Sequence, residues 1–437
     1  MSGRQDSQSR GVRIAEAAFP SPFKGGLEYS CAARGTWNIV HTGFLVPQCH
    51  EIFVCAAGCL RGVVLTAAEM GRSENFSTIE IRENDVLDGG MEQMITEGVT
   101  DILNGLSYKP RAVLVYTSCI HHFMGCDIQM CYDILRRRFP DTDFTDCYMD
   151  PIMRKSGLTP DQTMRRQVYS LIKPREKDVK KINIIGSNLP ADKESELYLT
   201  ARSAGYELTV IQDCKSYDDY QKMGEASANI YYDTTAAAAA AELEKRLSQK
   251  ALFLPLSYSY DEISKQLDKL CGYVGAQPYD CSEGISKCEE ALSETAKLLD
   301  GAPVEIDYTA VLRPFSLARL LLTHGINVTA LYCDSISGIE QGDFEFLKSN
   351  YPDIYLYPTM DVGMRDIERK RNVKTLAIGQ KAAYFSGSGY FVNIIESGGF
   401  YGFTGIQKLC GLIRDAWLNE KDMLSLIQIK GMGCGCV

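Results

Sequence analysis

The feature of this sequence that most constrains the fold is a pattern that recurs along most of the chain: a short apolar run, a turn of small residues and an amphipathic helical segment. One example starts with the apolar run at 112–116, continues through a turn containing Cys119 and Gly125, and ends in a helical segment from Asp127 to about Phe139. Further apolar runs that we expect to be strands lie at 182–186, 208–211, 304–312, 328–332, 354–357 and 376–379. Strands that alternate with helices predict parallel α/β sheets.

Two breaks divide this pattern into three segments of similar size. The stretch Lys173–Lys177 is charged and contains a proline, as linkers do, and Asp300–Pro303 forms a second break. We therefore predict three α/β domains, at residues 1–174, 175–301 and 302–437. The alanine run at 236–241 follows the capping candidates Asp233 and Thr234, so we expect a plain helix there.

Charge and hydropathy argue against two classes of partner. The net charge of −10 argues against nucleic acid, because binding to phosphates draws on clusters of Lys and Arg. No apolar run approaches the roughly 20 residues that span a bilayer. The polar, basic N-terminus has no apolar stretch after it and therefore resembles no secretion signal. We expect a cytoplasmic protein with neither a membrane nor a nucleic acid as its partner.

The 16 cysteines are an unusual number for such a chain. The cytosol keeps thiols reduced, so the remaining interpretations are metal ligands, catalytic thiols or small buried apolar residues. Several cysteines are scattered and have no ligand-like companions, and we assign them no function: Cys214, Cys271, Cys281, Cys288, Cys333 and Cys410.

Cys59 and Cys119 stand in the same local setting, each after a short predicted strand and before a helix. Ligands of open α/β sheets bind outside the carboxyl ends of the strands. Unpaired N–H groups at a helix start lower the pKa of a nearby thiol and so favour the thiolate that binds metal. Cys31, in the N-terminal loop, would be a third ligand. The long spacings fit no short iron–sulfur or zinc motif, so a shared cluster and three buried thiols in tight turns both stay open.

The stretch from about residue 28 to 135 resembles the first domain of nitrogenase component 1 proteins. That family includes the α and β subunits of the molybdenum–iron protein, cluster-assembly scaffolds and the dark-operative tetrapyrrole reductases. The resemblance implies three Rossmann-like parallel α/β domains around a central cleft. It rests on Cys31, the turn Ala57-Gly58-Cys59, the segment Glu83–Gly90, the block Lys109–Cys119, Gly125 and Asp127.

In this family the three cysteines bridge two homologous subunits through an iron–sulfur cluster. The resemblance therefore implies that Cys31, Cys59 and Cys119 bind a [4Fe-4S] or larger P-cluster-like cluster, shared with a sister subunit in a heterodimer or heterotetramer. It also implies a separate ATP-hydrolysing iron protein as electron donor. The sequence shows no Walker motif and no dinucleotide fingerprint after Gly186, so we expect this chain to bind no nucleotide.

Two segments depart from the family's pattern. In the nitrogenase α subunit, a cysteine of the second domain and a histidine of the third hold the active-site cofactor. The comparable segment Ala228–Asp233 has no cysteine, and Tyr401 stands at the histidine position. A phenol is a poor substitute for imidazole, so we do not expect this chain to reduce dinitrogen by itself. We expect Tyr401 to line a substrate cavity and donate a proton, or else to be a packed aromatic beside a turn.

Further candidate ligands lie close in sequence to the predicted cluster cysteines. They are Cys49, His50, Cys55, His121, His122, Cys126 and Cys131. They either pack around the cluster, or one or two of them, such as Cys55 or Cys126, replace a ligand or carry protons. The glycine-rich C-terminus either folds back and provides Cys434 and Cys436 as metal ligands, or makes no contact with the rest of the chain.

The sequence thus predicts an oxygen-sensitive iron–sulfur subunit of a nitrogenase-like oxidoreductase. It would pass electrons through an interfacial cluster to a substrate that the sequence does not identify. Two alternatives stay open: a scaffold on which a metal cluster is assembled, and a non-catalytic partner of a sister chain that holds the active site.

Overall fold

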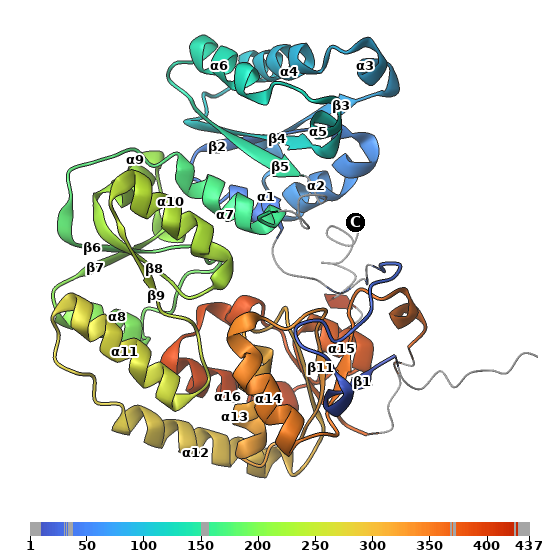
Figure 1. The fold of residues 1–437 in the computed structure, drawn as a ribbon, viewed down its shortest axis with the longest axis vertical. Helices are drawn as coiled ribbons and strands as arrows, with labels where there is room; N and C mark the ends of the chain where they lie inside the picture. Colours follow the sequence, from blue (N-terminus) through green and yellow to red (C-terminus); the bar gives the residue numbers. More distant parts are fainter. Residues whose placement is uncertain are drawn as a thin grey trace, which may run out of the picture. The chain divides into compact units, whose positions relative to one another are not determined.

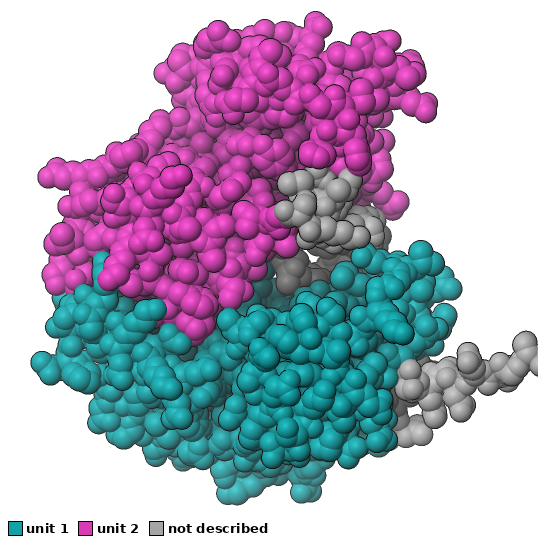
Figure 2. Space-filling model, in the orientation of Figure 1, with its two compact units in different colours: residues 1–36, 191–204, 256–435 teal, residues 37–190, 205–255, 436–437 magenta. Residues whose placement is uncertain are grey.

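The computed structural model describes residues 10–29, 31, 33, 38–149, 157–367, 369, 373–423 and 425–426. In these residues the chain forms three β-sheets with helices packed against them (Figure 1). The chain divides into two compact units (Figure 2). Unit 1 comprises residues 1–36, 191–204 and 256–435, and unit 2 comprises residues 37–190, 205–255 and 436–437.

The first sheet of unit 2 is fully parallel, with the strand order β3-β2-β4-β5. Its strands are β2 (Cys49–Ala56), β3 (Phe76–Ile81), β4 (Ala112–Ser118) and β5 (Asp143–Met149). The helices of this region are α1 (Ile39–Gly43), α2 (Ala57–Glu69), α3 (Glu83–Asp88), α4 (Met91–Gly105), α5 (Cys119–Met124), α6 (Ile128–Arg138) and α7 (Pro160–Ser170). The central strands β2 and β4 are buried along almost their whole length. Helices cover both faces of the sheet, and β4 accordingly begins with the continuous apolar run 112–116, whereas β2 also buries His50 and Glu51.

The second sheet of unit 2 is also parallel, with the order β7-β6-β8-β9. Its strands are β6 (Asp178–Ile184), β7 (Glu207–Val210), β8 (Ala226–Tyr231) and β9 (Lys250–Phe253), and its helices include α9 (Tyr217–Lys222) and α10 (Ala237–Leu247). The helix expected in the alanine run is confirmed: a 3-10 turn at Thr234–Ala236 leads into α10, and the Asp233 carboxylate accepts the N–H of Thr235.

Unit 1 contains the third sheet, with the order β1-β12-β11-β10-β13-β14. Its strands are β1 (Val12–Arg13), β10 (Val304–Asp307), β11 (Val328–Tyr332), β12 (Tyr355–Tyr357), β13 (Leu376–Ile378) and β14 (Phe391–Val392). The helices of unit 1 are α8 (Glu196–Ser203), α11 (Tyr260–Val274), α12 (Ser282–Leu299), α13 (Pro314–Thr323), α14 (Gln341–Asn350), α15 (Gln380–Ser386) and α16 (Gly402–Leu418). All pairings are parallel except that of β1, which runs antiparallel to β12 at the sheet edge. The sequence pattern did not predict β1.

The predicted fold class is confirmed, since the described residues form several parallel sheets flanked by helices. The exact domain boundaries at residues 174 and 301 and the central cleft stay predictions. No helix in the described ranges combines the length and the apolar character needed to cross a bilayer.

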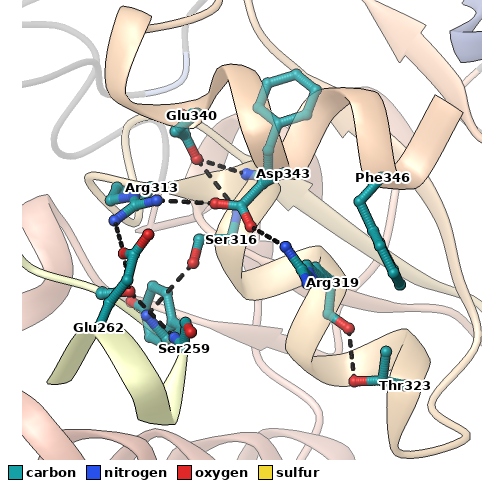
Figure 3. Close-up of polar contacts among 12 residues, drawn as sticks. Ser259, Glu262, Arg313, Ser316, Arg319, Thr323, Glu340, Asp343 and Phe346 are labelled. Atoms are coloured by element: carbon teal, nitrogen blue, oxygen red, sulfur yellow. Dashed lines mark hydrogen bonds and ion pairs between the residues drawn. The ribbon is translucent and has the colours of Figure 1, made fainter. Parts of the chain in front are cut away.

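A buried polar network holds three segments of unit 1 together (Figure 3). The Arg313 side chain is 3% exposed and donates to the carboxylates of Glu262 and Asp343 and to the backbone carbonyls of Leu256 and Ile339. The guanidinium thus joins the chain before α11, the start of α13 and the chain around α14. Buried charges are tolerated only when paired and hydrogen-bonded in this way.

Glu340 lies next to this network and caps α13 from outside the helix. Its Oε1 atom accepts the backbone N–H groups of Phe315 and Ser316 at 2.8 and 3.2 Å. Burial raises the pKa of Glu340 from 4.5 to about 8, although these N–H groups and Arg313 oppose the effect. The carboxyl group is therefore protonated in the folded protein at neutral pH.

This raised pKa predicts a loss of stability in mild alkali. Because the folded pKa lies above the unfolded value, the stabilisation is fully present below about pH 4.5 and is lost as the pH rises through about 8. We expect the free energy of unfolding to fall by up to a few kcal/mol between pH 6 and pH 9 from this group. Glu340→Gln keeps the accepting oxygen and should flatten that pH dependence in urea unfolding, whereas Glu345→Gln, at an exposed position of α14, should not. Equal pH dependence in both variants would contradict the assignment.

Candidate functional site

Cys59 and Cys119 lie at the same edge of the first sheet of unit 2. Strands β2 and β4 are parallel neighbours, and the helix after each strand carries one of the thiols. Cys59 is the third residue of α2 and is exposed, and Cys119 is the first residue of α5 and is partly buried. The prediction that both cysteines follow the carboxyl ends of strands is confirmed, but each lies in the first turn of its helix rather than before it.

The turn expected after β4 is a short helix instead. Helix α5 begins directly at Cys119 and ends at Met124, and its C-cap residue Gly125 has a φ of 66°. Its start is stabilised by a capping box, because the backbone N–H of Ser118 donates to Nδ1 of His121. The consequence is that the Cys119 backbone N–H lies in the first turn of a helix, where N–H groups point away from the helix and favour negative charge.

Cys55 is the buried neighbour of this pair in β2. Burial, together with the nearby thiols of Cys59 and Cys119, raises the pKa of the Cys55 thiol to about 12. Cys55 is therefore a neutral thiol within electrostatic range of both predicted ligands. Of the other candidates, Cys126 is partly exposed and Cys131 is buried in α6, and burial raises the pKa of each.

Cys49 and His50 are buried at the opposite end of β2. The His50 ring nitrogens bond to the hydroxyls of Tyr108 and Ser77 at 2.7 and 2.8 Å, and burial lowers the pKa of His50 to about 4. These contacts account for both ring nitrogens without a metal. Cys434 and Cys436 lie outside the described residues.

Cys31 lies in unit 1, whereas Cys59 and Cys119 lie in unit 2. The segment before Cys31 is attached to the loop after β12: the N–H of Tyr29 donates to the carbonyl of Met360 at 2.6 Å, and the N–H of Val362 donates to the carbonyl of Leu27 at 3.0 Å. The Cys31 side chain is 5% exposed in an apolar cluster that includes residues of α15.

Lys381 of α15 provides a positive charge for this part of unit 1, and sequence analysis did not single it out. Its side chain is buried and donates to Tyr308 Oη and Thr359 Oγ1 at 3.2 and 3.0 Å. Burial raises the pKa of the Cys31 thiol, and the Lys381 ammonium opposes that rise. A buried cation within electrostatic range of Cys31 favours its thiolate form, which is the form that ligates metal.

The thiols of unit 2 suit an iron–sulfur cluster chemically but do not make a full ligand set. Within the described ranges, no group of three or more His, Cys, Asp or Glu side chains is arranged to hold a metal ion. Cys59 and Cys119 supply two soft donors, one of them open to solvent. Further ligands would have to come from other cysteines of this chain or from another chain.

Exposed apolar side chains lie on the two helices that carry these thiols. Phe123 and Met124 of α5 are 69% and 45% exposed, and Val64 of α2 is 41% exposed. Single exposed apolar residues are ordinary, but their position on the cysteine-bearing helices gives the edge an apolar character.

Tyr401 is 3% exposed and occupies the N-cap position of α16. Gly402 beside it allows two parts of unit 1 to approach closely, because a Cβ atom at this position would overlap Oε2 of Glu196. Oε1 of Glu196 accepts the backbone N–H and the hydroxyl of Thr404 at 2.9 and 2.8 Å. The close approach at Gly402 thus serves a carboxylate of the protein itself. The role of Tyr401 in lining a substrate cavity stays a prediction.

The chain before Tyr401 is held in an unusual backbone conformation. Glu396 and Ser397 have φ values of 48° and 60°, which non-glycine residues rarely adopt. Their backbone N–H groups donate to the carbonyls of Thr309 and Ala310, after β10. Strain of this kind persists only where the surrounding contacts enforce it, and it concentrates at functional sites.

Comparisons with known proteins agree with this fold. The sequence model of the family described as nitrogenase component 1 type oxidoreductase matches residues 36–376. The solved structure of nitrogenase Cp1 at pH 6.5 is 15% identical, with 91% of this chain and 94% of that chain covered at a TM-score of 0.66. For nitrogenase Cp1 at pH 5, the identity is 13%, the coverage is 90% of each chain and the TM-score is 0.59. A comparison with curated protein sequences finds no match. Since the family model spans most of the sequence, the chain belongs to the nitrogenase component 1 type oxidoreductases.

Proposed function

We propose that this chain is an iron–sulfur subunit of a nitrogenase-like reductase, with Cys31, Cys59 and Cys119 as ligands of one cluster. The observation that supports this most directly is the exposed thiol of Cys59 beside Cys119 at the carboxyl edge of one parallel sheet. An exposed thiol contributes nothing to a core, whereas two neighbouring thiols at helix starts are suited to bind iron as thiolates. When bound, the cluster supplies one-electron transfer.

A homologous sister subunit would complete the cluster and cover this edge. Three cysteines are fewer than the four protein ligands of a cubane cluster, so one ligand comes from the partner or from a nearby cysteine such as Cys55. The exposed Phe123, Met124 and Val64 lie on the helices that carry the thiols and would be buried by the partner. Family membership supports the same arrangement.

The electron donor in this proposal is a separate ATP-hydrolysing iron protein, and the complex acts in the cytoplasm. The sequence has no phosphate-binding loop of the Walker type, so this chain contributes ligands and binding surfaces rather than nucleotide hydrolysis. The final acceptor is an unidentified substrate, and we assign Tyr401 as its proton donor.

Tyr401→Phe tests the proposed proton donor. It removes only the hydroxyl of a buried residue, so the fold and the iron content should be unchanged. Loss of a general acid should slow turnover by roughly 10²-fold or more. Tyr390→Phe, at a less buried tyrosine of unit 1, is the matched control. Unchanged turnover in Tyr401→Phe would remove the acid role and leave Tyr401 as a packed aromatic.

The proposed function is tested by purifying the chain without oxygen, together with the products of neighbouring genes. We expect a brown complex that contains a second homologous chain, iron and acid-labile sulfide. A colourless, iron-free preparation that includes the sister chain would overturn the cluster.

The alternative of a non-catalytic partner of a sister chain is favoured by the segment Ala228–Asp233, which has no cysteine, and by Tyr401 at the family's histidine position. An assembly scaffold is the other alternative, and one further measurement separates it from a reductase subunit. A scaffold would lose its iron to an apo-acceptor protein, whereas a reductase subunit would keep its iron through repeated reduction by the iron protein and ATP.

A further inference from the structure

Two cysteines that have no ligand-like companions in the sequence lie close together in unit 1. Cys271 lies in the last turn of α11, and Cys281 is the N-cap residue of α12, the next helix of the chain. The loop that joins the two helices brings both thiols to one residue, Tyr279. The fold thus makes a pair of two cysteines that are ten positions apart in the sequence.

Each sulfur of this pair bonds to the backbone of Tyr279. The Cys281 Sγ atom donates to the Tyr279 carbonyl at 3.6 Å. The Tyr279 backbone also bonds to the Cys271 sulfur in a way that favours the thiolate, so its N–H group is the donor. Burial raises the pKa of the Cys271 thiol, this hydrogen bond opposes the rise, and the Cys281 thiol adds to it. The two sulfurs are therefore within electrostatic range of each other on one short peptide segment.

The two thiols differ in their access to a reagent. Cys271 lines a cavity of about 550 Å³, together with residues of α8 and the loop 275–280. Its side chain is only 3% exposed, whereas Cys281 is partly exposed. A small reagent therefore meets Cys281 first, and Cys271 is the protected thiol of the pair. Asp280 also lines the cavity, so an uncharged reagent suits this location better than an anionic one.

We propose that Cys271 and Cys281 form a reversible disulfide by exchange with a low-molecular-weight disulfide. The Cys281 thiolate attacks one sulfur of the small disulfide, forms a mixed disulfide and releases one small thiolate. The Cys271 thiolate then attacks the Cys281 sulfur, forms the bond between the two cysteines and displaces the second small thiolate. The protein thiols lose two electrons, which reduce the small disulfide to two thiols, and the two protein protons go to the released thiolates.

This bond would tie α11 to the end of α12 that packs against α16. A Cβ atom on Gly284 of α12 would lie 2.9 Å from the ring of Phe403 in α16, and the Cys288 thiol donates to the Phe403 carbonyl at 3.3 Å. Oxidation would therefore restrain a tightly packed part of unit 1. The proposal does not rest on the cluster, because both cysteines lie outside the set of proposed iron ligands.

The test equilibrates the anaerobically purified full chain with mixtures of 2-hydroxyethyl disulfide and 2-mercaptoethanol. Free thiols are then blocked with N-ethylmaleimide in denaturant before digestion with trypsin. Residues 270–287 form one tryptic peptide that contains Cys271, Cys281 and no other cysteine. We expect this peptide to carry two maleimide groups under reducing conditions. Under oxidising conditions it should carry none and be lighter than the unmodified peptide by two hydrogen atoms.

The same equilibrium measured in guanidinium chloride shows whether the fold holds the two thiols together. The folded chain should form the bond about tenfold or more readily than the denatured chain, at the same concentrations of small disulfide and thiol, because its thiols do not have to find each other. Cys333 is the internal control, since it is 0% exposed in unit 1 and is the one cysteine of the tryptic peptide 320–348. Its peptide should carry one maleimide group under both conditions when the chain is oxidised in the folded state.

Two variants test the order of the two steps. Cys271→Ser should trap the small thiol on Cys281 as a mixed disulfide, whereas Cys281→Ser should leave the protected Cys271 unmodified in the folded chain. The proposal is overturned if the peptide 270–287 keeps both thiols in the oxidising mixture, or if the bond forms no more readily in the folded chain than in denaturant. A mixed disulfide on Cys271 of Cys281→Ser, with none on Cys281 of Cys271→Ser, would overturn the assignment of Cys281 as the attacking thiol.

Discussion

Replacing Cys59 or Cys119 with alanine is expected to remove most of the iron from the anaerobically purified complex. Both thiols follow neighbouring parallel strands and lie in the first turn of a helix. Each variant would delete a thiolate from a ligand set that is already short of four within this chain. The expected effect is therefore loss of the cluster rather than a graded change in its properties.

Two cysteines outside the proposed site serve as controls for this measurement. Cys147 is buried in β5 of the same sheet, and Cys281 is partly exposed in unit 1. Alanine at Cys147 should cost roughly 1–2 kcal/mol of stability through lost packing and leave the iron content unchanged. Iron and sulfide are measured per chain, with circular dichroism to verify folding. Equal iron in all four variants would refute the assignment.

Cys31→Ala in the same series tests whether the N-terminal loop provides the third ligand. Iron loss equal to that of Cys59→Ala is expected for a shared cluster. Full iron content in Cys31→Ala, with loss in the other two, would restrict the ligands of this chain to unit 2.

Arg313→Ala is expected to destabilise unit 1 by roughly 3–5 kcal/mol, which is the usual cost of removing one partner of a buried ion pair and leaving the other charge unpaired. The substitution leaves Asp343, whose side chain is 7% exposed, without its buried cation. It also removes the donors to the carbonyls of Leu256 and Ile339. The three segments joined in Figure 3 would then lose their common contact.

Arg319→Ala is the matched control, because Arg319 also donates to Asp343 but its side chain is 42% exposed. An ion pair with one partner as exposed as Arg319 contributes about 1 kcal/mol or less to the free energy of unfolding. Urea unfolding followed by circular dichroism should therefore show a large shift of the midpoint for Arg313→Ala and a small shift for Arg319→Ala. Similar shifts in the two variants would show that Arg313 does not hold the network.

The sequence by itself determined the repeating strand–helix order and, with it, the position of Cys59 and Cys119. The apolar runs at 112–116 and 328–332 lie in the observed strands β4 and β11, because a strand covered on both faces needs an uninterrupted apolar run. Residues that follow such strands necessarily gather at the carboxyl edge of a parallel sheet. The motif around Cys59 and Cys119 was also sufficient to suggest the family.

Only the tertiary structure decided where the N-terminal segment and the isolated polar residues belong. Strand β1 has two residues and pairs with β12, more than 300 positions away in the sequence, so it leaves no periodic signal. The burial of Lys381 and Arg313 likewise depends on segments that meet only after folding. The physical reason is that hydrophobic periodicity reports the environment of a residue along its own helix or strand, whereas the partner of a buried charge or donor is set by contacts between distant elements.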